Sequence, residues 1–267
     1  MQPFPENIPK LKYDGKLIIF SSVYQWICYA NYVNSLVKTV AVLDAFGVRW
    51  DYWQHTGDFH IERAVNGNLT RFMNDPDATD FLMLDVDEGW EPQDVVRLLM
   101  HDEEVVAGTY RQKNKWHEYN GVLSLKDGRP QGKPLTDGSV LLLAERVPGG
   151  FLRIKKSALL KFAAAYPDLR SKEDCEVVAF FERIKECGEG ETIPQVYSQD
   201  MAFSWRWRQM GERLWIDPML KIRHGGFTEY PGDLDAHLRG KSELEKAVST
   251  IQGMAAEIQQ RAAGTAA

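Results

Sequence analysis

Apolar and polar positions along the first 110 or so residues alternate between two spacings. Short, nearly continuous apolar runs are typical of buried strands, and they occur at residues 16–23, 48–53, 81–86 and 104–110. The segments between them carry apolar residues at helical spacing, at residues 26–46, 61–73 and 92–100. Strands that alternate with helices in this way predict a parallel sheet built from right-handed crossovers.

The pattern changes after residue 119. Turn-forming clusters surround short apolar runs between residues 119 and 147, which predicts a small antiparallel insertion. Beyond it we expect strands at 151–154 and 213–217, and helices at 157–166 (capped by Ser157), 176–186 and 200–210. The predicted fold class is therefore α/β, a mainly parallel sheet flanked by helices with a small antiparallel insertion. We expect one domain over residues 1–240 and a helical tail over 241–267.

Composition limits the class of protein. A chain of 267 residues with 44% hydrophobic and 26% charged residues is typical of a soluble globular protein. The net charge of −6 gives no overall basic field for nucleic acid. Three cysteines, Cys28, Cys175 and Cys187, lack metal-ligand spacing, which favours packing roles and a reducing, cytoplasmic location. The longest apolar stretches are too short to span a membrane, and the N-terminus does not have the pattern of a signal peptide, so no membrane partner is expected.

The candidate chemistry begins where one buried strand ends. Four apolar residues, Phe81 to Leu84, are followed at once by Asp85-Val-Asp87-Glu88. Open α/β sheets bind ligands beyond the carboxyl ends of their strands. Two carboxylates one residue apart can bind a divalent cation, which in turn neutralises a diphosphate. The alternative for this segment is a solvated turn.

Several further segments follow in a fixed order over residues 17–226. They are Arg63-Ala-Val-Asn66, Asp85-Val-Asp87, Val106-Ala-Gly-Thr-Tyr110, Gly149-Gly-Phe151, Gln199-Asp200, Gly211-x-x-Leu-Trp-Ile-Asp217-Pro and His224-Gly-Gly. In this order and spacing the chain resembles glycosyltransferases of the GT-A fold, in the family-2-like group that uses nucleotide sugars. The resemblance implies transfer of a sugar from a nucleotide-diphosphate sugar, with a UDP-sugar favoured, to an acceptor hydroxyl.

The same resemblance implies a metal site. Asp87 is the expected main ligand, His224 is expected to complete the shell, and Asp85 is expected to reach the ribose or to bind the metal through water. An imidazole ligand favours manganese over magnesium. The alternative for His224 is a structural histidine.

Other positions are expected to hold the substrates. Arg63 is assigned to a donor phosphate or an acid of the site, Asn66 to the nucleotide and Lys113 to the diphosphate; for the first two, a polar helix face is the alternative. Gly149 and Gly150 would let the backbone approach the donor sugar or the acceptor closely. A purely structural turn is the alternative for this glycine pair.

Asp200 is the expected catalytic base. A carboxylate at a helix N-terminus is kept ionised by the helix dipole and can take the proton of an acceptor hydroxyl. The glycosyltransferases that the chain resembles usually have Glu-Asp at this position. This chain has Gln199 in place of the glutamate, and its amide cannot take up a proton. The alternative is that Asp200 only caps the helix, in which case Glu88, Asp217 or a mechanism without an enzyme base would follow.

The acceptor is less well defined. Two segments combine basic and aromatic residues, Arg111–His117 and Trp205–Arg208, and Trp205 is the expected acceptor-binding residue. Such segments suit carbohydrate or DNA, for example a hydroxymethylated base. Because the net charge is negative, we rank a soluble saccharide or protein above DNA. Trp205 or Trp207 could instead belong to the core.

Two other classes of protein stay open. A nucleotidyltransferase would also bind a nucleotide and a divalent cation, but it usually has a glycine-rich basic loop after the first strand, and residues 21–26 contain neither glycine nor lysine. A non-catalytic nucleotide-sugar- or carbohydrate-binding protein would have no need of Asp200.

Overall fold

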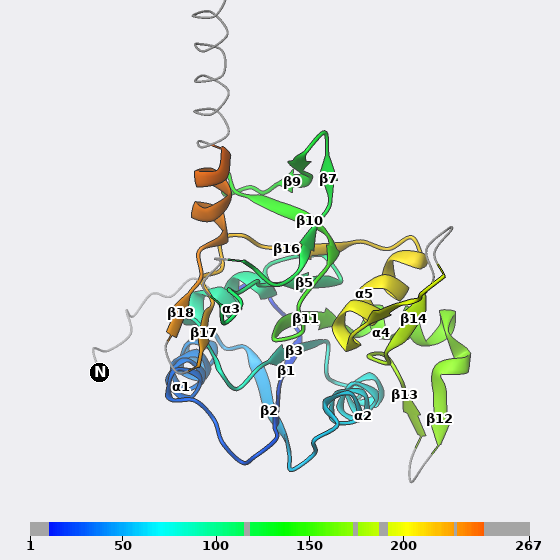
Figure 1. The fold of residues 1–267 in the computed structure, drawn as a ribbon. Helices are drawn as coiled ribbons and strands as arrows, with labels where there is room; N and C mark the ends of the chain where they lie inside the picture. Colours follow the sequence, from blue (N-terminus) through cyan, green and yellow to red (C-terminus); the bar gives the residue numbers. More distant parts are fainter. Residues whose placement is uncertain (1–10, 115–117, 173–175, 187–191, 227–228, 243–267) are drawn as a thin grey trace, which may run out of the picture.

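The computed structural model describes residues 11–114, 118–172, 176–186, 192–226 and 229–242. It confirms the predicted class, because helices pack on a large central sheet and smaller antiparallel sheets lie at its margins (Figure 1). The helices are α1 (Ala30–Ala45), α2 (Ile61–Asn74), α3 (Pro92–Leu99), α4 (Lys156–Ala165), the 3₁₀ helix η1 (Pro167–Leu169) and α5 (Gln199–Gln209), and residues 234–242 are also helical.

The central sheet has the strand order β2-β1-β3-β11-β5-β16-β10-β6, with β9 also paired to β10. Its strands are β1 (Lys16–Val23), β2 (Arg49–Thr56), β3 (Asp80–Leu84), β5 (Val105–Ala107), β6 (Val122–Leu123), β9 (Gly132–Pro134), β10 (Val140–Arg146), β11 (Phe151–Lys155) and β16 (Leu214–Ile216). The smaller sheets contain β4 (Glu88–Gly89), β7 (Leu125–Lys126), β8 (Arg129–Pro130), β12 (Arg170–Lys172), β13 (Glu176–Val178), β14 (Ile184–Glu186), β15 (Gln195–Tyr197), β17 (Arg223–Gly225) and β18 (Glu229–Pro231).

Strand β11 interrupts the expected parallel order. β1 is parallel to β2 and β3, and β5 is parallel to β16, so these five strands share one direction. The sequence suggested that β3 and β5 belong to consecutive repeats. In the structure β11 lies between them and pairs antiparallel with both. The carboxyl ends of the five co-directional strands still lie at one edge of the sheet.

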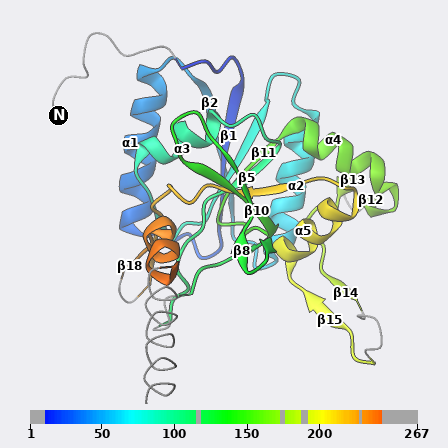
Figure 2. The same ribbon diagram turned by 90° about the horizontal axis from the view of Figure 1, so that it is seen from above.

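Two apolar layers cover the sheet, one on each face. Along β3, Phe81 and Met83 pack into the core beneath α2, α4 and α5, while Leu82 and Leu84 pack into the core beneath α1 and α3. Figure 2 shows the two groups of helices on opposite sides of the strands. All residues of β3 are buried, as the continuous apolar run predicted.

The predicted helix at 176–186 is wrong. The segment forms β13 and β14, and the turn between them carries Phe180 and Phe181 into the core. Side chains of α2 accept from its backbone: Thr70 Oγ1 lies 3.0 Å from Val178 N and Asn66 Oδ1 lies 2.8 Å from Phe181 N. These tertiary bonds satisfy amides that a helix would have bonded internally.

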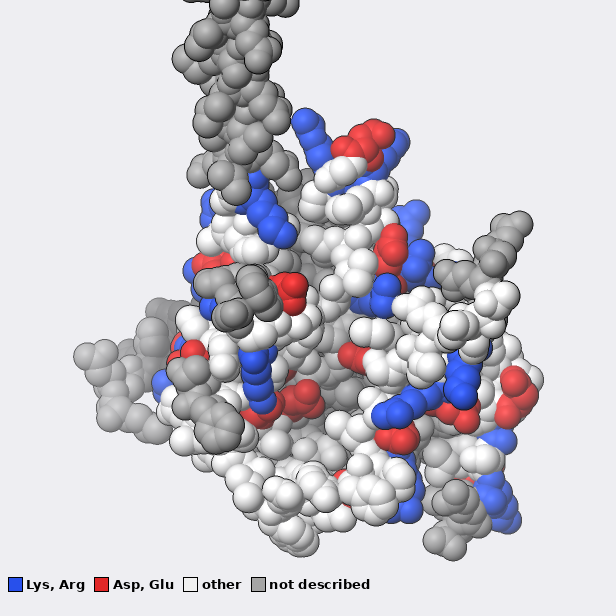
Figure 3. All heavy atoms as spheres, viewed as in Figure 1, with Lys and Arg blue, Asp and Glu red and all other residues white. Residues whose placement is uncertain are grey.

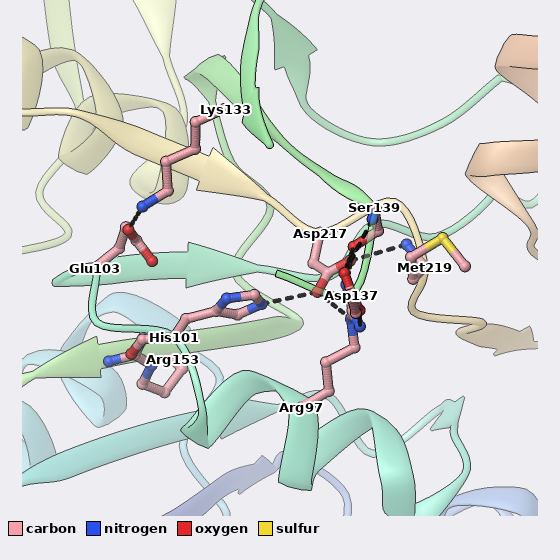
Figure 4. Close-up of polar contacts among 9 residues, drawn as sticks. All are labelled: Arg97, His101, Glu103, Lys133, Asp137, Ser139, Arg153, Asp217 and Met219. Atoms are coloured by element: carbon pink, nitrogen blue, oxygen red, sulfur yellow. Dashed lines mark hydrogen bonds and ion pairs between the residues drawn. The ribbon is translucent and has the colours of Figure 1, made fainter. Parts of the chain in front are cut away.

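The predicted antiparallel insertion is confirmed, and β6 to β10 form it. An ion-pair cluster connects it to α3 (Figure 4). Arg97 donates to Asp217 Oδ2 at 2.5 Å, to Asp137 Oδ2 at 2.5 Å and to Ser139 Oγ at 2.7 Å. His101 Nε2 lies 2.8 Å from the same Asp217 oxygen. Asp217 is fully buried in this cluster, which gives it a structural role in place of the alternative role as a base.

Other sequence expectations concern helix ends and termini. Helix α4 begins at Lys156 with Lys155 in the capping position, so Ser157 is not its cap. No helix within the described residues is long and apolar enough to cross a membrane. Cys28 is half-buried, while Cys175 and Cys187 lie outside the described residues. Of the helical tail expected over 241–267, residues 241 and 242 are helical and residues 243–267 lie outside the described residues.

We expect the substitution Arg153→Ala to lower the free energy of unfolding by about 3–5 kcal/mol, because it leaves the buried Asp80 carboxylate without its cationic partner. Arg153, fully buried on β11, donates to Asp80 Oδ1 at 3.2 Å and to the His101 carbonyl at 3.0 Å. Chemical denaturation measures the change. The control Arg170→Ala removes an exposed ion pair with Glu176 and should cost about 1 kcal/mol or less; equal losses would contradict the prediction.

Candidate functional site

The candidate site forms where β3 ends beside the glycine pair. Asp85 follows the last residue of β3, and its backbone amide donates to the Gly150 carbonyl at 2.9 Å. A Cβ atom on Gly150 would lie 2.4 Å from Glu88 Oε1, 2.6 Å from Asp85 Oδ2 and 2.6 Å from the Tyr110 hydroxyl. Three polar groups therefore converge on the one position that lacks a side chain, so the glycine is required there.

A pocket opens beside this point. It encloses about 440 Å³, part of it open to solvent, and lies between the start of α2, the end of β3 and the start of α5. Its lining residues are Ile61, Glu62, Val65, Met83, Asp85, Tyr110, Gly149, Gly150, Phe181, Gln199 and Asp200. In Figure 3 this face of the molecule is hollowed, and acidic side chains lie around the hollow.

Asp87, Lys113 and His224 lie together next to Asp85. Strand β17 pairs with β4, which places His224 opposite Glu88 in the register. His224 Nδ1 donates to the Arg111 carbonyl at 2.7 Å, and its Nε2 lies 3.7 Å from Asp87 Oδ2. The Lys113 ammonium donates to the same Asp87 oxygen. Three of the residues predicted for metal and diphosphate are thus neighbours.

The carboxyl groups of this edge differ in their protonation. Burial raises the pKa of Asp85 to about 6, and the charge of Asp87 adds to the rise. Burial likewise raises the pKa of Glu88 well above its usual value. For Asp87 burial also raises the pKa, but bonds with His224 and Lys113 outweigh it, and the net pKa is lowered. Asp87 is therefore the carboxylate best kept ionised near neutral pH.

Glu88 is a buried acid without a fixed partner. Neither of its carboxyl oxygens has a partner of hydrogen-bond geometry among the described residues, although the Tyr110 hydroxyl lies close and partly offsets the rise in the pKa of Glu88. The side chain is fully buried. A protonated Glu88 fits this position because a buried charge without a partner is costly.

The residues present fit part of a metal shell. Asp87 and His224 offer a carboxylate and an imidazole, and His224 bonds a carbonyl through its other ring nitrogen, as metal-bound histidines commonly do. Within the part of the chain that is described, no three His, Cys, Asp or Glu side chains form a complete centre. A diphosphate would have to supply further oxygens, and Lys113 would have to leave Asp87. The metal remains a prediction.

Asp200 lines the pocket from the first turn of α5. Ser198 holds the N-cap position and Gln199 is the first helical residue, so Asp200 is not the N-cap of this helix. Asp200 Oδ1 accepts from Ser198 Oγ at 2.8 Å and from the Met201 amide at 2.9 Å. The negative side chain lies where the helix dipole favours it.

Two residues expected to bind the donor have structural contacts instead of a place in the pocket lining. Arg63 makes a two-bond contact with Asp58, at 2.7 and 2.9 Å, which lowers the pKa of Asp58 to about 2. Asn66 is buried and uses its side-chain oxygen to hold the Phe181 amide. Asn66 therefore shapes the pocket by placing Phe181 in its wall.

The basic and aromatic segment of α5 is largely internal. Trp207 is fully buried, and its indole donates to the Arg213 carbonyl at 3.0 Å. Arg206 is buried and donates to the Glu182 carbonyl at 2.8 Å. Trp205 is half-buried and is not one of the pocket-lining residues. Residues 115–117 of the other segment lie outside the described residues.

Sequence reasoning assigned no site role to Glu62, Tyr110 or Phe181, although all three line the pocket. Tyr110 carried a usable signal, because it closes the segment after β5 at the same sheet edge as Asp85. Glu62 had the position of an ordinary acid in the first turn of a helix. Phe181 lay in a segment assigned to a helix, so its place was not foreseeable.

Comparisons with known proteins add no assignment. No protein-family model matches the chain, and no curated protein matches it. Among solved structures it is similar to A197 from STIV, at 15% identity over 78% of this chain and 85% of that one, with a TM-score of 0.44. It is also similar to 4-diphosphocytidyl-2C-methyl-D-erythritol synthase from Anaerococcus prevotii, at 10% identity over 87% and 100% of the chains, with a TM-score of 0.36.

A third solved structure is a glycosyltransferase involved in the glycosylation of the major capsid of PBCV-1. The identity is 13% over 56% of this chain and 66% of that chain, with a TM-score of 0.30. At such TM-scores the three likenesses carry no inference about activity.

We expect Gly150→Ala to lower the free energy of unfolding by about 1–3 kcal/mol, because the new methyl group would overlap the Glu88, Asp85 and Tyr110 side chains. Thermal or denaturant unfolding measures it. The matched control is Gly67→Ala in α2, where an added Cβ meets nothing within 4 Å; this change should be neutral or stabilise by up to about 1 kcal/mol. A harmless Gly150→Ala would show that the acidic side chains do not converge there.

Proposed function

We propose that the protein is a metal-dependent glycosyltransferase that moves a sugar from a nucleotide-diphosphate sugar to an acceptor hydroxyl. One observation carries the proposal: Asp85 stands between two different environments at the same sheet edge. On one side lie Asp87, Lys113 and His224, and on the other lies the pocket that contains Asp200. A cation-binding group beside a pocket with a carboxylate suits a reaction in which an anion leaves and a hydroxyl attacks.

The leaving diphosphate would be held by Asp87, Lys113 and His224 together. Lys113 can donate to phosphate oxygens once it leaves Asp87, and such charge-assisted bonds are stronger than neutral ones. Asp87 and His224 would hold a divalent cation, for which manganese is favoured over magnesium. When bound, the cation stabilises the negative charge that grows on the diphosphate. Asp85 would hold the ribose or a metal-bound water, and a UDP-sugar is the favoured donor.

Asp200 would accept the proton. As the acceptor oxygen forms its bond to the anomeric carbon, the bond from that carbon to the diphosphate breaks and its electron pair leaves with the phosphate oxygen. The hydroxyl proton passes to Asp200. Within the described residues, Asp200 Oδ1 accepts the hydrogen bonds from Ser198 and Met201, which leaves Oδ2 to take the proton. Gly149 lies close by, with its Cβ position 3.6 Å from the Asp200 Cβ, and keeps the approach open.

The other two classes are less well supported. The segment after β1 has no glycine or lysine between Ser21 and Trp26, so it does not provide the basic triphosphate-binding loop of a nucleotidyltransferase. A binding protein without catalysis would not require Asp200, and the second experiment below distinguishes this class.

We expect Asp87→Ala to abolish metal-dependent binding of a nucleoside diphosphate, because it removes the ionised carboxylate that His224 and Lys113 contact. Calorimetry with uridine diphosphate, with and without manganese, measures the affinity. Asp127→Ala, in an exposed turn of the insertion, is the control and should bind as the wild type does. Unchanged affinity in Asp87→Ala would exclude the proposed metal site.

We expect Asp200→Asn to lower turnover at least about a hundredfold while donor binding is retained, because a positioned base contributes about a hundredfold to ten-thousandfold in rate. The asparagine keeps the shape and can still accept from Ser198, so the loss of stability should be small. Steady-state transfer rates and donor calorimetry separate the two effects. Turnover at the wild-type rate would exclude Asp200 as the base.

A further inference from the structure

Glu62 is the third carboxyl group of the pocket lining, beside Asp85 and Asp200, and it has no assigned role so far. It lies in the first turn of α2, lines the pocket, and its side chain is 34% exposed. The Gln199 side-chain amide donates to Glu62 Oε2 at 3.0 Å. This bond joins the start of α2 to the start of α5 across the pocket, since both residues belong to its lining.

Glu62 is ionised near neutral pH. Its own backbone amide lowers the pKa of the carboxyl group, burial opposes this, and the bond from Gln199 lowers the pKa further. The nearest imidazole, His60 Nδ1, lies 3.8 Å from Oε1. Gln199 engages Oε2, and the carboxylate, with its side chain 34% exposed in the pocket lining, can accept from a ligand hydroxyl as well.

The remaining lining limits what can enter. Glu62, Asp85 and Asp200 place three acidic groups in one pocket, and no lysine or arginine is found among its described lining residues, although the charge of nearby Arg183 helps to lower the pKa of Glu62. Phosphate groups would be repelled there, whereas hydroxyl groups can donate to carboxylates. The apolar part of the lining consists of Ile61, Val65 and Phe181, which can pack against the C–H face of a sugar ring.

We propose that Glu62, oriented by Gln199, binds a hydroxyl group of a neutral saccharide, and that this saccharide is the acceptor of the transfer. Only the statement that the saccharide is the acceptor rests on the proposed function; the binding of a saccharide by Glu62 does not. Glu62 would touch the substrate, while Gln199 is a positioning residue that acts through Glu62. A phosphate-bearing polymer such as DNA is then excluded from the pocket by its charge.

The first experiment measures binding by saturation-transfer NMR. The probes are the neutral methyl glycosides of glucose, galactose and mannose, with glucose 6-phosphate and a short single-stranded oligonucleotide as phosphate-bearing probes. The wild type should bind at least one neutral glycoside, and neither phosphate-bearing probe should displace it from the pocket. Glu62→Gln should weaken glycoside binding at least about tenfold, as expected for the loss of a hydrogen bond to a charged group.

Glu212→Gln is the matched control. The Glu212 side chain is 33% exposed and pairs with Lys161 outside the pocket, so its loss should leave glycoside affinity unchanged. Gln199→Ala should weaken binding less than Glu62→Gln does, and should add nothing to Glu62→Gln in the double variant because it acts through that carboxylate. Circular dichroism confirms that each variant is folded.

The second experiment uses transfer kinetics with the bound glycoside. Glu62→Gln should raise the KM for the acceptor more than it lowers kcat, the reverse of the Asp200→Asn pattern. Glycoside affinity unchanged in Glu62→Gln, no glycoside binding by the wild type, or preferred binding of the oligonucleotide would overturn the proposal. If glycoside binding depends on Glu62 but the protein binds no nucleotide with manganese, the proposed transferase function is excluded and the proposed saccharide binding by Glu62 is supported.

Discussion

At Gly150 the main chain passes so close to the end of β3 that its carbonyl accepts from the Asp85 amide, and there is no room for even one more carbon atom. The side chains of Asp85, Glu88 and Tyr110 meet in the space left over. This crowding buries acidic groups next to one another, which raises the pKa of Asp85 and Glu88. Beside these acids, the Lys113 ammonium donates to Asp87, and the His224 ring lies next to the same carboxylate.

Much of the central sheet and its flanking helices can be predicted from the sequence, because the apolar patterns that indicate them are local. The apolar run Phe81–Leu84 can be buried on both faces only within a sheet, and the acids after it had to emerge at the edge. The helix predicted for residues 176–186 is wrong because bonds from Thr70 and Asn66, more than a hundred residues away in sequence, hold the backbone of this segment in another conformation. Local pattern carries no information about such tertiary partners.

The site was foreseeable to the extent that each residue follows a strand or opens a helix. Asp85 and Asp200 satisfy this and share a pocket, and Asp87, Lys113 and His224 lie beside it. Arg63 and Asn66 face outward or inward from a helix, where the sequence cannot tell a ligand contact from a contact with the chain itself. The structure shows the latter, with Asp58 and with the Phe181 amide. The bond between Gln199 and Glu62 joins two helices 137 positions apart and leaves no trace in the sequence.

The position of β11 has a consequence for how the chain assembles during synthesis. β3 and β5 are both complete by residue 107, yet neither pairs with the other, because the space between them is filled by residues 151–155. Two strand edges therefore stay open until the insertion and β11 have left the ribosome. Unpaired edges can pair with other chains, and domains are generally made from the N-terminus onward. The gap between β3 and β5 closes when β11 is made, while the other edge of β5 stays open until β16 follows at residues 214–216, so the nascent sheet exposes unpaired edges until then.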